Sequence, residues 1–218
     1  MHTSVNNLAL INKQIKTKFG NLSKLNIIAV SKTFPINEIN PLIKSGHIHF
    51  GENKVQEACK KWPDVKILFS NIKLHMVGKL QTNKVKQAVP LFDYIHSLDN
   101  FKLASKISIE QKKINRNIKI FIQVNLGNET QKSGIDKKNL VEFHRTCVDE
   151  FKLDIIGLMC IPPNETEVKS YFKELADLNN TLGLKELSMG MSSDYLKAIN
   201  FGATFVRIGS KIFGSRSQ

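Results

Sequence analysis

The feature that most constrains this fold is an alternation of short β-type runs with helical patterns, repeated along the whole chain. The predicted strands cover residues 26–30, 47–50, 74–77, 94–97, 118–124, 154–159, 186–188 and 204–208. Helical patterns lie between them, at residues 37–45, 53–61, 82–89, 100–115, 137–150, 165–182 and 193–201. Eight such strands in this order predict an α/β fold, a single (β/α)8 barrel of the TIM type.

An open, doubly wound sheet is the main alternative, because two of the predicted strands are short and the strand count depends on them. No GxGxxG sequence opens the first helix, which removes the main support for a dinucleotide-binding sheet. The chain has 218 residues, 41% of them hydrophobic, and no Pro/Gly/Ser-rich linker. We therefore expect one domain that spans residues 1–218.

The cysteines and the N-terminal segment indicate a cytoplasmic protein. Cys59, Cys147 and Cys160 are odd in number and widely spaced, which argues against a disulfide framework or a cysteine-based zinc site. The N-terminal apolar residues recur at helical spacing and form no uninterrupted apolar segment. No run of 18 apolar residues follows, so we expect no membrane association.

The formal net charge of +13 raises the alternative of nucleic-acid binding through released phosphate counterions. The lysines are spread over nearly every segment, and no basic stretch is interleaved with aromatic residues that would stack on bases. The arginines are few: Arg116, Arg145, Arg207 and Arg216. We therefore expect no specific nucleic-acid partner. Nucleic-acid binding would instead predict an affinity that falls steeply with salt.

Lys32 closes the first predicted strand, where an amine would leave a hydrophobic sheet. A lysine that loses hydration there tends toward a lowered pKa and a nucleophilic amine, which makes Lys32 a candidate for Schiff-base formation. The alternative is a lysine at the end of a strand that extends its ammonium group into solvent.

Small and polar residues follow the last two predicted strands. In barrels, these two loops often hold phosphate, because backbone N–H groups freed by glycine converge there on an anion. The candidates are Gly190, Ser192, Ser193, Gly209 and Ser210. Taken singly, each is better explained as a helix cap than as a ligand, but two such loops at the ends of neighbouring strands, opposite a lysine, favour a phosphate site. Further polar or small residues at strand ends are Asn53, Gly78 and Asn125, and His75 lies within the third predicted strand.

A nucleophilic amine opposite a phosphate site suggests a phosphorylated aldehyde or ketone as the ligand. Pyridoxal 5'-phosphate (PLP) is the leading candidate, although a class I aldolase would use the same two elements. Arg207 would then face the ring nitrogen of PLP. Since arginine keeps its proton, it would hold that nitrogen unprotonated. The alternative for Arg207 is a salt bridge at the end of the barrel.

Seven motifs, in order along the chain, resemble the pyridoxal phosphate homeostasis protein family. They are AVSKTFP (29–35), FGENKVQEA (50–58), HMVGKLQTNK (75–84), IQVN with KSGI (122–125 and 132–135), GLMCIPP (157–163), SMGMSSDYLKAI (188–199) and VRIGSKIFGSR (206–216). The resemblance implies a barrel similar to the N-terminal domain of alanine racemase, with PLP held as a Schiff base on Lys32. It also implies that Ser192 contacts the phosphate, that Arg207 and Gly209 belong to the site, and that Asn53 lines the pocket.

The resemblance further implies a regulator of intracellular PLP and vitamin B6 balance that has no established turnover. Alanine racemase uses a second domain with a catalytic tyrosine, and this sequence stops ten residues after Ile208. We interpret Tyr94 and Tyr195 as packing residues, so no second acid/base group is evident. The expected partners are PLP and PLP-accepting apoenzymes. The alternative function is a PLP-dependent amino-acid racemase or lyase that acts through the same Schiff base.

Overall fold

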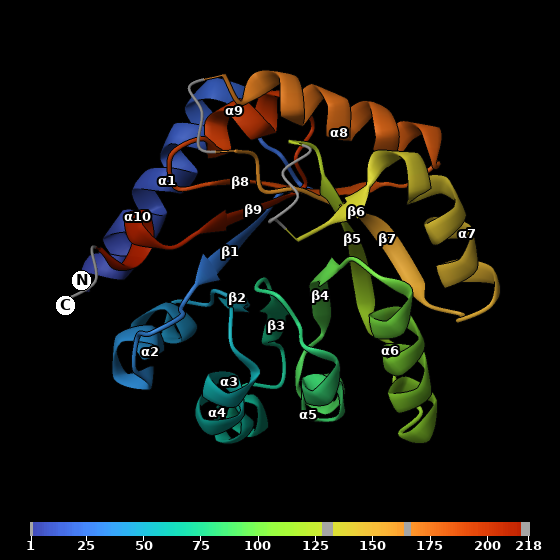
Figure 1. Cartoon of the computed structure of the whole chain (residues 1–218). Coiled ribbons are helices and arrows are strands. Elements are labelled where there is room, and N and C mark those ends of the chain that lie inside the picture. Colours follow the sequence, from blue (N-terminus) through green and yellow to red (C-terminus); the bar gives the residue numbers. More distant parts are fainter. Residues whose placement is uncertain (1, 128–132, 164–166, 215–218) are drawn as a thin grey trace.

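The computed structural model describes residues 2–127, 133–163 and 167–214. Within them, eight parallel strands close into a barrel with the helices around its outside (Figure 1). The barrel strands are β1 (Asn26–Val30), β2 (His49–Glu52), β3 (Lys73–Met76), β4 (Tyr94–Leu98), β5 (Lys119–Asn125), β7 (Asp154–Met159), β8 (Glu186–Met191) and β9 (Phe205–Ile208). A two-residue strand, β6 (Ile135–Asp136), pairs with β5 at its edge. Pairing of β4 with β5 and of β1 with β9 closes the barrel.

Helices connect each barrel strand to the next, as the right-handed crossover of parallel strands requires, and one further helix precedes the first strand while another follows the last. They are α1 (Thr3–Phe19), α2 (Ile36–Lys44), α3 (Val55–Lys61), α4 (Pro63–Leu68), α5 (Val85–Leu91), α6 (Phe101–Lys113), α7 (Leu140–Asp149), α8 (Lys169–Thr181), α9 (Tyr195–Asn200) and α10 (Ser210–Phe213). Helix α1 precedes the first strand and packs against α10 after the last one (Figure 1).

The predicted barrel is confirmed, and all eight predicted strands are present in order. Many boundaries shift by one or two residues, and two differences are larger. The seventh predicted strand ends at residue 188, whereas β8 continues to Met191. Helix α4 was not predicted, and it begins at Pro63, where a missing N–H costs a helix nothing. The predicted start of helix 165–182 lies outside the described residues, as do residue 132 and residues 215 and 216 of the family motifs.

Apolar side chains form two layers, one on each side of the barrel wall. The outer layer packs the strands against the helices and includes the fully buried Trp62, Phe143 and Phe172. The inner layer fills the barrel interior with Ile28, Val30, Tyr94, Phe121, Met159 and Phe205. Alternate residues of each strand therefore face opposite layers, which explains the continuous apolar runs in the sequence.

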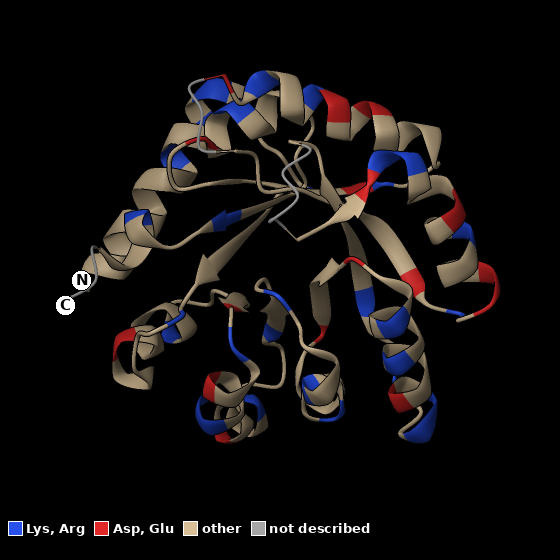
Figure 2. Cartoon of the chain, in the orientation of Figure 1, with Lys and Arg blue, Asp and Glu red and all other residues tan. Residues whose placement is uncertain are grey.

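Basic residues are spread over many helices and strands, with acidic residues among them (Figure 2). This distribution resembles the one expected from the sequence, in which no segment concentrates the positive charge. Across the described part of the chain, none of the helices has the length and apolar character needed to span a bilayer.

Candidate functional site

A cavity of about 860 Å³ lies at the carboxyl ends of the barrel strands. Side chains and backbone from the ends of β1, β2, β3, β8 and β9 line it, which is the end of a TIM barrel where ligands bind. The cavity brings together the five candidate site residues that the family resemblance implies: Lys32, Asn53, Ser192, Arg207 and Gly209. They come from four separate segments of the sequence, so their proximity follows from the fold.

Lys32 lies in the turn after β1, and the backbone on both sides of it is held firmly. The buried Ser31 donates its N–H to the Gly51 carbonyl at 2.9 Å. Lys61 Nζ donates to the Ser31 carbonyl at 3.1 Å. On the other side, the Thr33 N–H donates to Glu57 Oε1 at 2.7 Å. The Cα of Lys32 is thus fixed at the edge of the cavity.

Thr33 has a φ of 70°, which is rare for a β-branched residue. Such strain is kept only where the surrounding contacts determine the conformation. Here the hydrogen bond to Glu57 holds the turn. The turn is what directs the chain away from β1 immediately after Lys32.

Asn53 follows the end of β2, lines the cavity and carries an unusual polar atom. Its Oδ1 is buried and has no hydrogen-bond partner in the part of the chain that the structure describes. Gly78 packs directly against its backbone, since a Cβ at residue 78 would lie 2.5 Å from the Asn53 carbonyl oxygen. A buried acceptor without a partner costs free energy, so a ligand that donates a hydrogen bond would fit here.

The loops after β8 and β9 meet at the Ser192 hydroxyl. The Gly209 N–H donates to Ser192 Oγ at 3.3 Å, and the Lys211 N–H lies 3.5 Å from the same oxygen. A side chain at residue 209 would crowd the wall, because its Cβ would stand 3.3 Å from the Val30 carbonyl oxygen. One hydroxyl and two converging backbone donors form the kind of site that accepts a phosphate.

The loop after β8 is shaped by a tight turn. Gly190 has a φ of +89°, and a Cβ there would approach the Ala198 Cβ to 2.6 Å. The Met191 N–H donates to Asp194 Oδ1 at 2.6 Å. This close approach of strand and α9 requires glycine and places Ser192 at the rim of the cavity.

Arg207 comes from β9 and points into the barrel interior, where it is only 5% exposed. Its Nη1 donates to Ser188 Oγ at 2.7 Å, and its Nη2 donates to the Cys160 carbonyl at 2.8 Å. Both partners are neutral, so this contact differs from the salt bridge considered as the alternative. Burial lowers the pKa of Arg207 from its usual value. The guanidinium thus brings a positive charge to the floor of the cavity, with neutral hydrogen-bond partners among the described residues and the Asp194 carboxylate acting on it at longer range.

The sequence assigned no role to Ser188, which was predicted as the last residue of a strand. The residue lies inside β8, fully buried, and it bridges Arg207 to His96. The available signal was a histidine in each of three successive predicted strands, at positions 49, 75 and 96. Tyr94 and Tyr195 are both largely buried, in β4 and α9 respectively, as predicted for packing residues.

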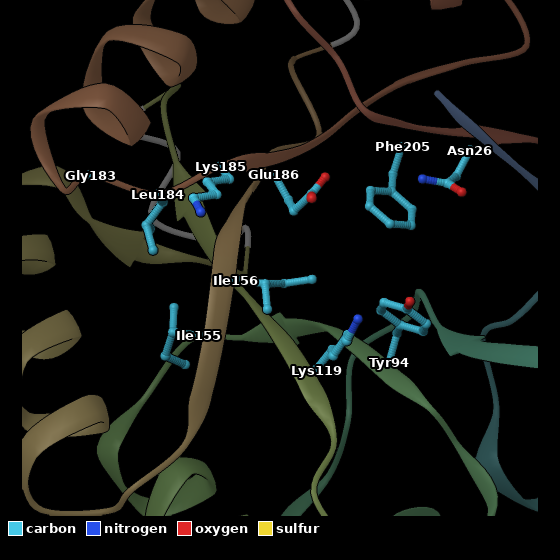
Figure 3. A pocket seen from close by; sticks show the side chains of 10 residues that line it. All are labelled: Asn26, Tyr94, Lys119, Ile155, Ile156, Gly183, Leu184, Lys185, Glu186 and Phe205. Atoms are coloured by element: carbon cyan, nitrogen blue, oxygen red, sulfur yellow. The ribbon is translucent and has the colours of Figure 1, made fainter. Parts of the chain in front are cut away.

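A second cavity, of about 440 Å³, lies at the opposite end of the barrel and contains none of the five candidate residues. Figure 3 shows Lys119 beside the Tyr94 ring, with Phe205 and Glu186 also lining the space. These residues begin their strands, so this cavity lies at the amino-terminal end of the barrel. In TIM barrels, that end contributes mainly to stability.

Comparisons with known proteins match nearly the whole chain. The family model described as alanine racemase, N-terminal domain, matches residues 7–217. A pyridoxal phosphate homeostasis protein from Aquifex aeolicus is 40% identical over 199 residues, covering 87% of this chain and 86% of the relative. One from Escherichia coli K12 is 33% identical and covers 99% of this chain and 98% of the relative.

Solved structures support the same relationship. PipY of Synechococcus elongatus with PLP bound has a TM-score of 0.87 at 33% identity, covering 97% of this chain and all of PipY. An alanine racemase from Clostridium difficile shares only the fold, with a TM-score of 0.70 at 15% identity over 58% of that chain. Because these relatives are 33–40% identical and cover 87–99% of this chain, the chain belongs to the pyridoxal phosphate homeostasis protein family.

Proposed function

We propose that this chain binds PLP in the cavity at the carboxyl ends of its strands and takes part in PLP homeostasis. The observation that carries the proposal is the meeting of Lys32 with Ser192, Gly209 and Arg207 in one cavity. The volume of about 860 Å³ lies within the range of small-molecule sites. The relatives bear the name of pyridoxal phosphate homeostasis proteins, and the solved structures similar to this chain include PipY with PLP bound.

Lys32 is proposed to hold PLP as a Schiff base. Its Nζ would attack the aldehyde carbon, and the aldehyde oxygen would leave as water when the C=N bond forms. The rigid backbone around Lys32, held through Lys61 and Glu57, supports a fixed attachment point. When bound, the cofactor would supply an electron-withdrawing ring.

The remaining residues would orient PLP. Ser192 and the N–H groups of Gly209 and Lys211 would receive the phosphate, because they already converge on one point. The unpartnered Oδ1 of Asn53 would accept a hydrogen bond from the ligand. Arg207 would face the ring nitrogen and keep it unprotonated, since a buried guanidinium with neutral partners opposes a second positive charge.

Storage or delivery of PLP is favoured over turnover as the role of the site. Both tyrosines that could act as a base are largely buried, and Tyr195 donates its hydroxyl to Gln14 at 2.6 Å, away from the cavity. The curated relatives are named as homeostasis proteins and not as enzymes. A cytoplasmic single-domain protein of residues 1–218, with PLP-accepting apoenzymes as recipients, is part of this proposal. A PLP-dependent racemase or lyase is the second candidate.

The test is an absorption spectrum of the protein mixed with PLP, before and after borohydride, for wild type, Lys32→Ala and Lys79→Ala. Lys79 is exposed and follows the cavity residue Gly78 without lining the cavity, so it controls for nonspecific lysine modification. A Schiff-base band that borohydride fixes in wild type and Lys79→Ala, and that Lys32→Ala lacks, is expected. A band that persists in Lys32→Ala would contradict the assignment.

The choice between the two functions needs one further measurement on the PLP-loaded protein. Amino acids in deuterated water should remove PLP without exchanging their α-proton if the protein stores or delivers the cofactor. Sustained α-proton exchange that Lys32→Ala abolishes would favour the racemase or lyase.

A further inference from the structure

A continuous line of hydrogen-bonding side chains runs through the barrel interior to Arg207. His49 Nδ1 lies 2.9 Å from His75 Nε2, and His75 Nδ1 lies 2.9 Å from His96 Nε2. His96 Nδ1 lies 2.8 Å from Ser188 Oγ, which accepts from Arg207 Nη1 at 2.7 Å. The line crosses from β2 through β3, β4 and β8 to β9. We call these five residues the histidine chain.

Aromatic packing holds the rings of the histidine chain in place. His75 stacks on Tyr94 with ring centroids 4.2 Å apart, and His96 stacks on Phe121 at 4.4 Å. His75 and His96 are fully buried, whereas His49 is partly exposed and borders another cavity, near α1. The chain therefore connects the amino-terminal end of the barrel to the proposed PLP site.

The chemistry of the Arg207 end determines the direction of every hydrogen bond in the histidine chain. Arginine has donors only, so the Ser188 oxygen must be the acceptor from Arg207. Among the described residues, the only other partner of the Ser188 hydroxyl is His96, and the hydroxyl proton is satisfied if it is donated to His96 Nδ1. His96 then carries its proton on Nε2 and donates it to His75.

The same reasoning continues down the chain. His75 accepts at Nδ1, so it donates from Nε2 to His49 Nδ1. His49 in turn keeps its proton on Nε2, at the partly exposed end. The opposite direction would make both His96 and Arg207 donate to Ser188. The Ser188 proton would then be stranded without an acceptor at a fully buried position.

The inferred direction also matches the charge of Arg207. Each neutral imidazole would turn its unprotonated nitrogen, the negative end of its dipole, toward the guanidinium. Aligned hydrogen bonds polarise one another, so the chain would stabilise a buried cation whose hydrogen-bond partners are neutral. Burial favours neutral imidazoles, because it lowers the pKa of both His75 and His96 well below the usual value.

We propose that His49, His75, His96 and Ser188 are positioning residues that form a one-way hydrogen-bond chain, with every imidazole in the Nε2–H form, to hold the Arg207 guanidinium toward the ligand. The identity of the ligand as PLP rests on the function proposed above. The histidine chain itself is present in the protein without a ligand. The site thus reaches beyond the residues that line its cavity.

Nitrogen-15 NMR of the full chain with labelled histidine, without PLP, tests the tautomers directly. Couplings from the ring carbon protons should show protonated Nε2 and unprotonated Nδ1 in both His75 and His96 at neutral pH. Substitution of each residue in turn assigns the signals. A proton on Nδ1 of either ring, or on both nitrogens of one ring, would overturn the proposal. This result does not depend on whether PLP binds.

Two substitutions of His96, by glutamine and by asparagine, test how the histidine chain affects ligand binding. The Oδ1 of an asparagine at residue 96 can lie near the position of His96 Nδ1, so it keeps an acceptor for the Ser188 hydroxyl. The amide of a glutamine instead lies near the position of His96 Nε2, so the Ser188 hydroxyl loses its acceptor. We expect His96→Gln to raise the Kd for PLP about tenfold and His96→Asn to restore most of the affinity. His144→Gln, in α7 and outside the chain, is the control.

The outcomes separate the two proposals. Wild-type affinity in His96→Gln, or an equally large loss in a folded His96→Asn, would overturn the positioning role. If wild type itself bound no PLP, the proposed function would fail, while the tautomers measured in the ligand-free protein would still decide the structure of the chain.

Discussion

Gly78 packs so closely on Asn53 that a Cβ at residue 78 would stand 2.5 Å from the Asn53 carbonyl oxygen and 2.8 Å from its Cα. This contact fixes the backbone of Asn53 at the rim of the cavity. The side-chain oxygen is buried and lacks a partner within the described residues. The protein thus holds a polar atom in an unfavourable state at the place where the ligand is proposed to bind.

Asn53→Ala should therefore weaken binding without weakening the fold. Removing an unsatisfied acceptor costs little stability, whereas the ligand loses a hydrogen bond. We expect the Kd for PLP to rise about tenfold, with the free energy of unfolding of the ligand-free protein within about 0.5 kcal/mol of wild type. PLP titration and urea unfolding measure the two quantities. A large loss of stability with unchanged affinity would show that Asn53 is purely structural.

Ser192→Ala should weaken the binding of PLP but not that of pyridoxal, which lacks the phosphate. The hydroxyl lies where the N–H groups of Gly209 and Lys211 converge. Loss of a hydrogen bond to a charged group costs about 1.5–3 kcal/mol, or about 10- to 100-fold in Kd. Ser193→Ala is the matched control, since Ser193 lines the same cavity without these two contacts. An equal loss in both variants would exclude a specific phosphate site at Ser192.

The barrel was predictable from the sequence because burial on both faces leaves each strand as an apolar run. The end of β8 was not predictable in this way, since Gly190 and the serine residues near it are typical of a loop. In the structure, Gly190 stays in the strand with a φ of +89° because α9 packs against it. This contact depends on how α9 folds back onto β8, which the residues of the strand alone do not indicate.

The five candidate site residues came from strand ends and family motifs, and the cavity includes all five. The histidine chain could not be derived in the same way. His49, His75 and His96 are far apart in the sequence, and their hydrogen bonds depend on the register that pairs Gly51 with His75 and Met76 with Ile95. Taken singly, each histidine resembles an ordinary buried polar residue.

Ser188→Ala should destabilise the ligand-free protein by about 2 kcal/mol, because it leaves Arg207 Nη1 and His96 Nδ1 buried without their partner. Ser97, which lies outside the histidine chain, is a matched control. It is 1% exposed, and its hydroxyl has no partner in the described residues. Ser97→Ala should be neutral or slightly stabilising. Urea unfolding of both variants measures the difference. Equal effects would show that the Ser188 contacts contribute nothing.

Stability should fall as the pH is lowered from about 7 to 5, because buried histidines resist protonation in the folded state. Burial lowers the pKa of His47 from 6.5 to about 4. Burial, together with the charges of His47 and Lys73, lowers that of His49 to about 4, with Asp93 acting in the opposite direction. A folded pKa below the unfolded value means that the unfolded chain binds more protons in this window. The stabilisation is therefore complete above pH 6.5 and is lost between pH 6.5 and about 4.

For His47 alone, the loss by pH 5 is about 2 kcal/mol. His47 Nε2 donates to the His49 carbonyl at 2.9 Å, a bond that the amide of glutamine can replace. His47→Gln should therefore keep the fold at pH 7.5 and reduce the difference in unfolding free energy between pH 7.5 and pH 5 by about that amount. Urea unfolding at both pH values provides the comparison. If His47→Gln showed the same pH dependence as wild type, His47 would titrate equally in the folded and unfolded states, and the acid sensitivity would have to come from another group.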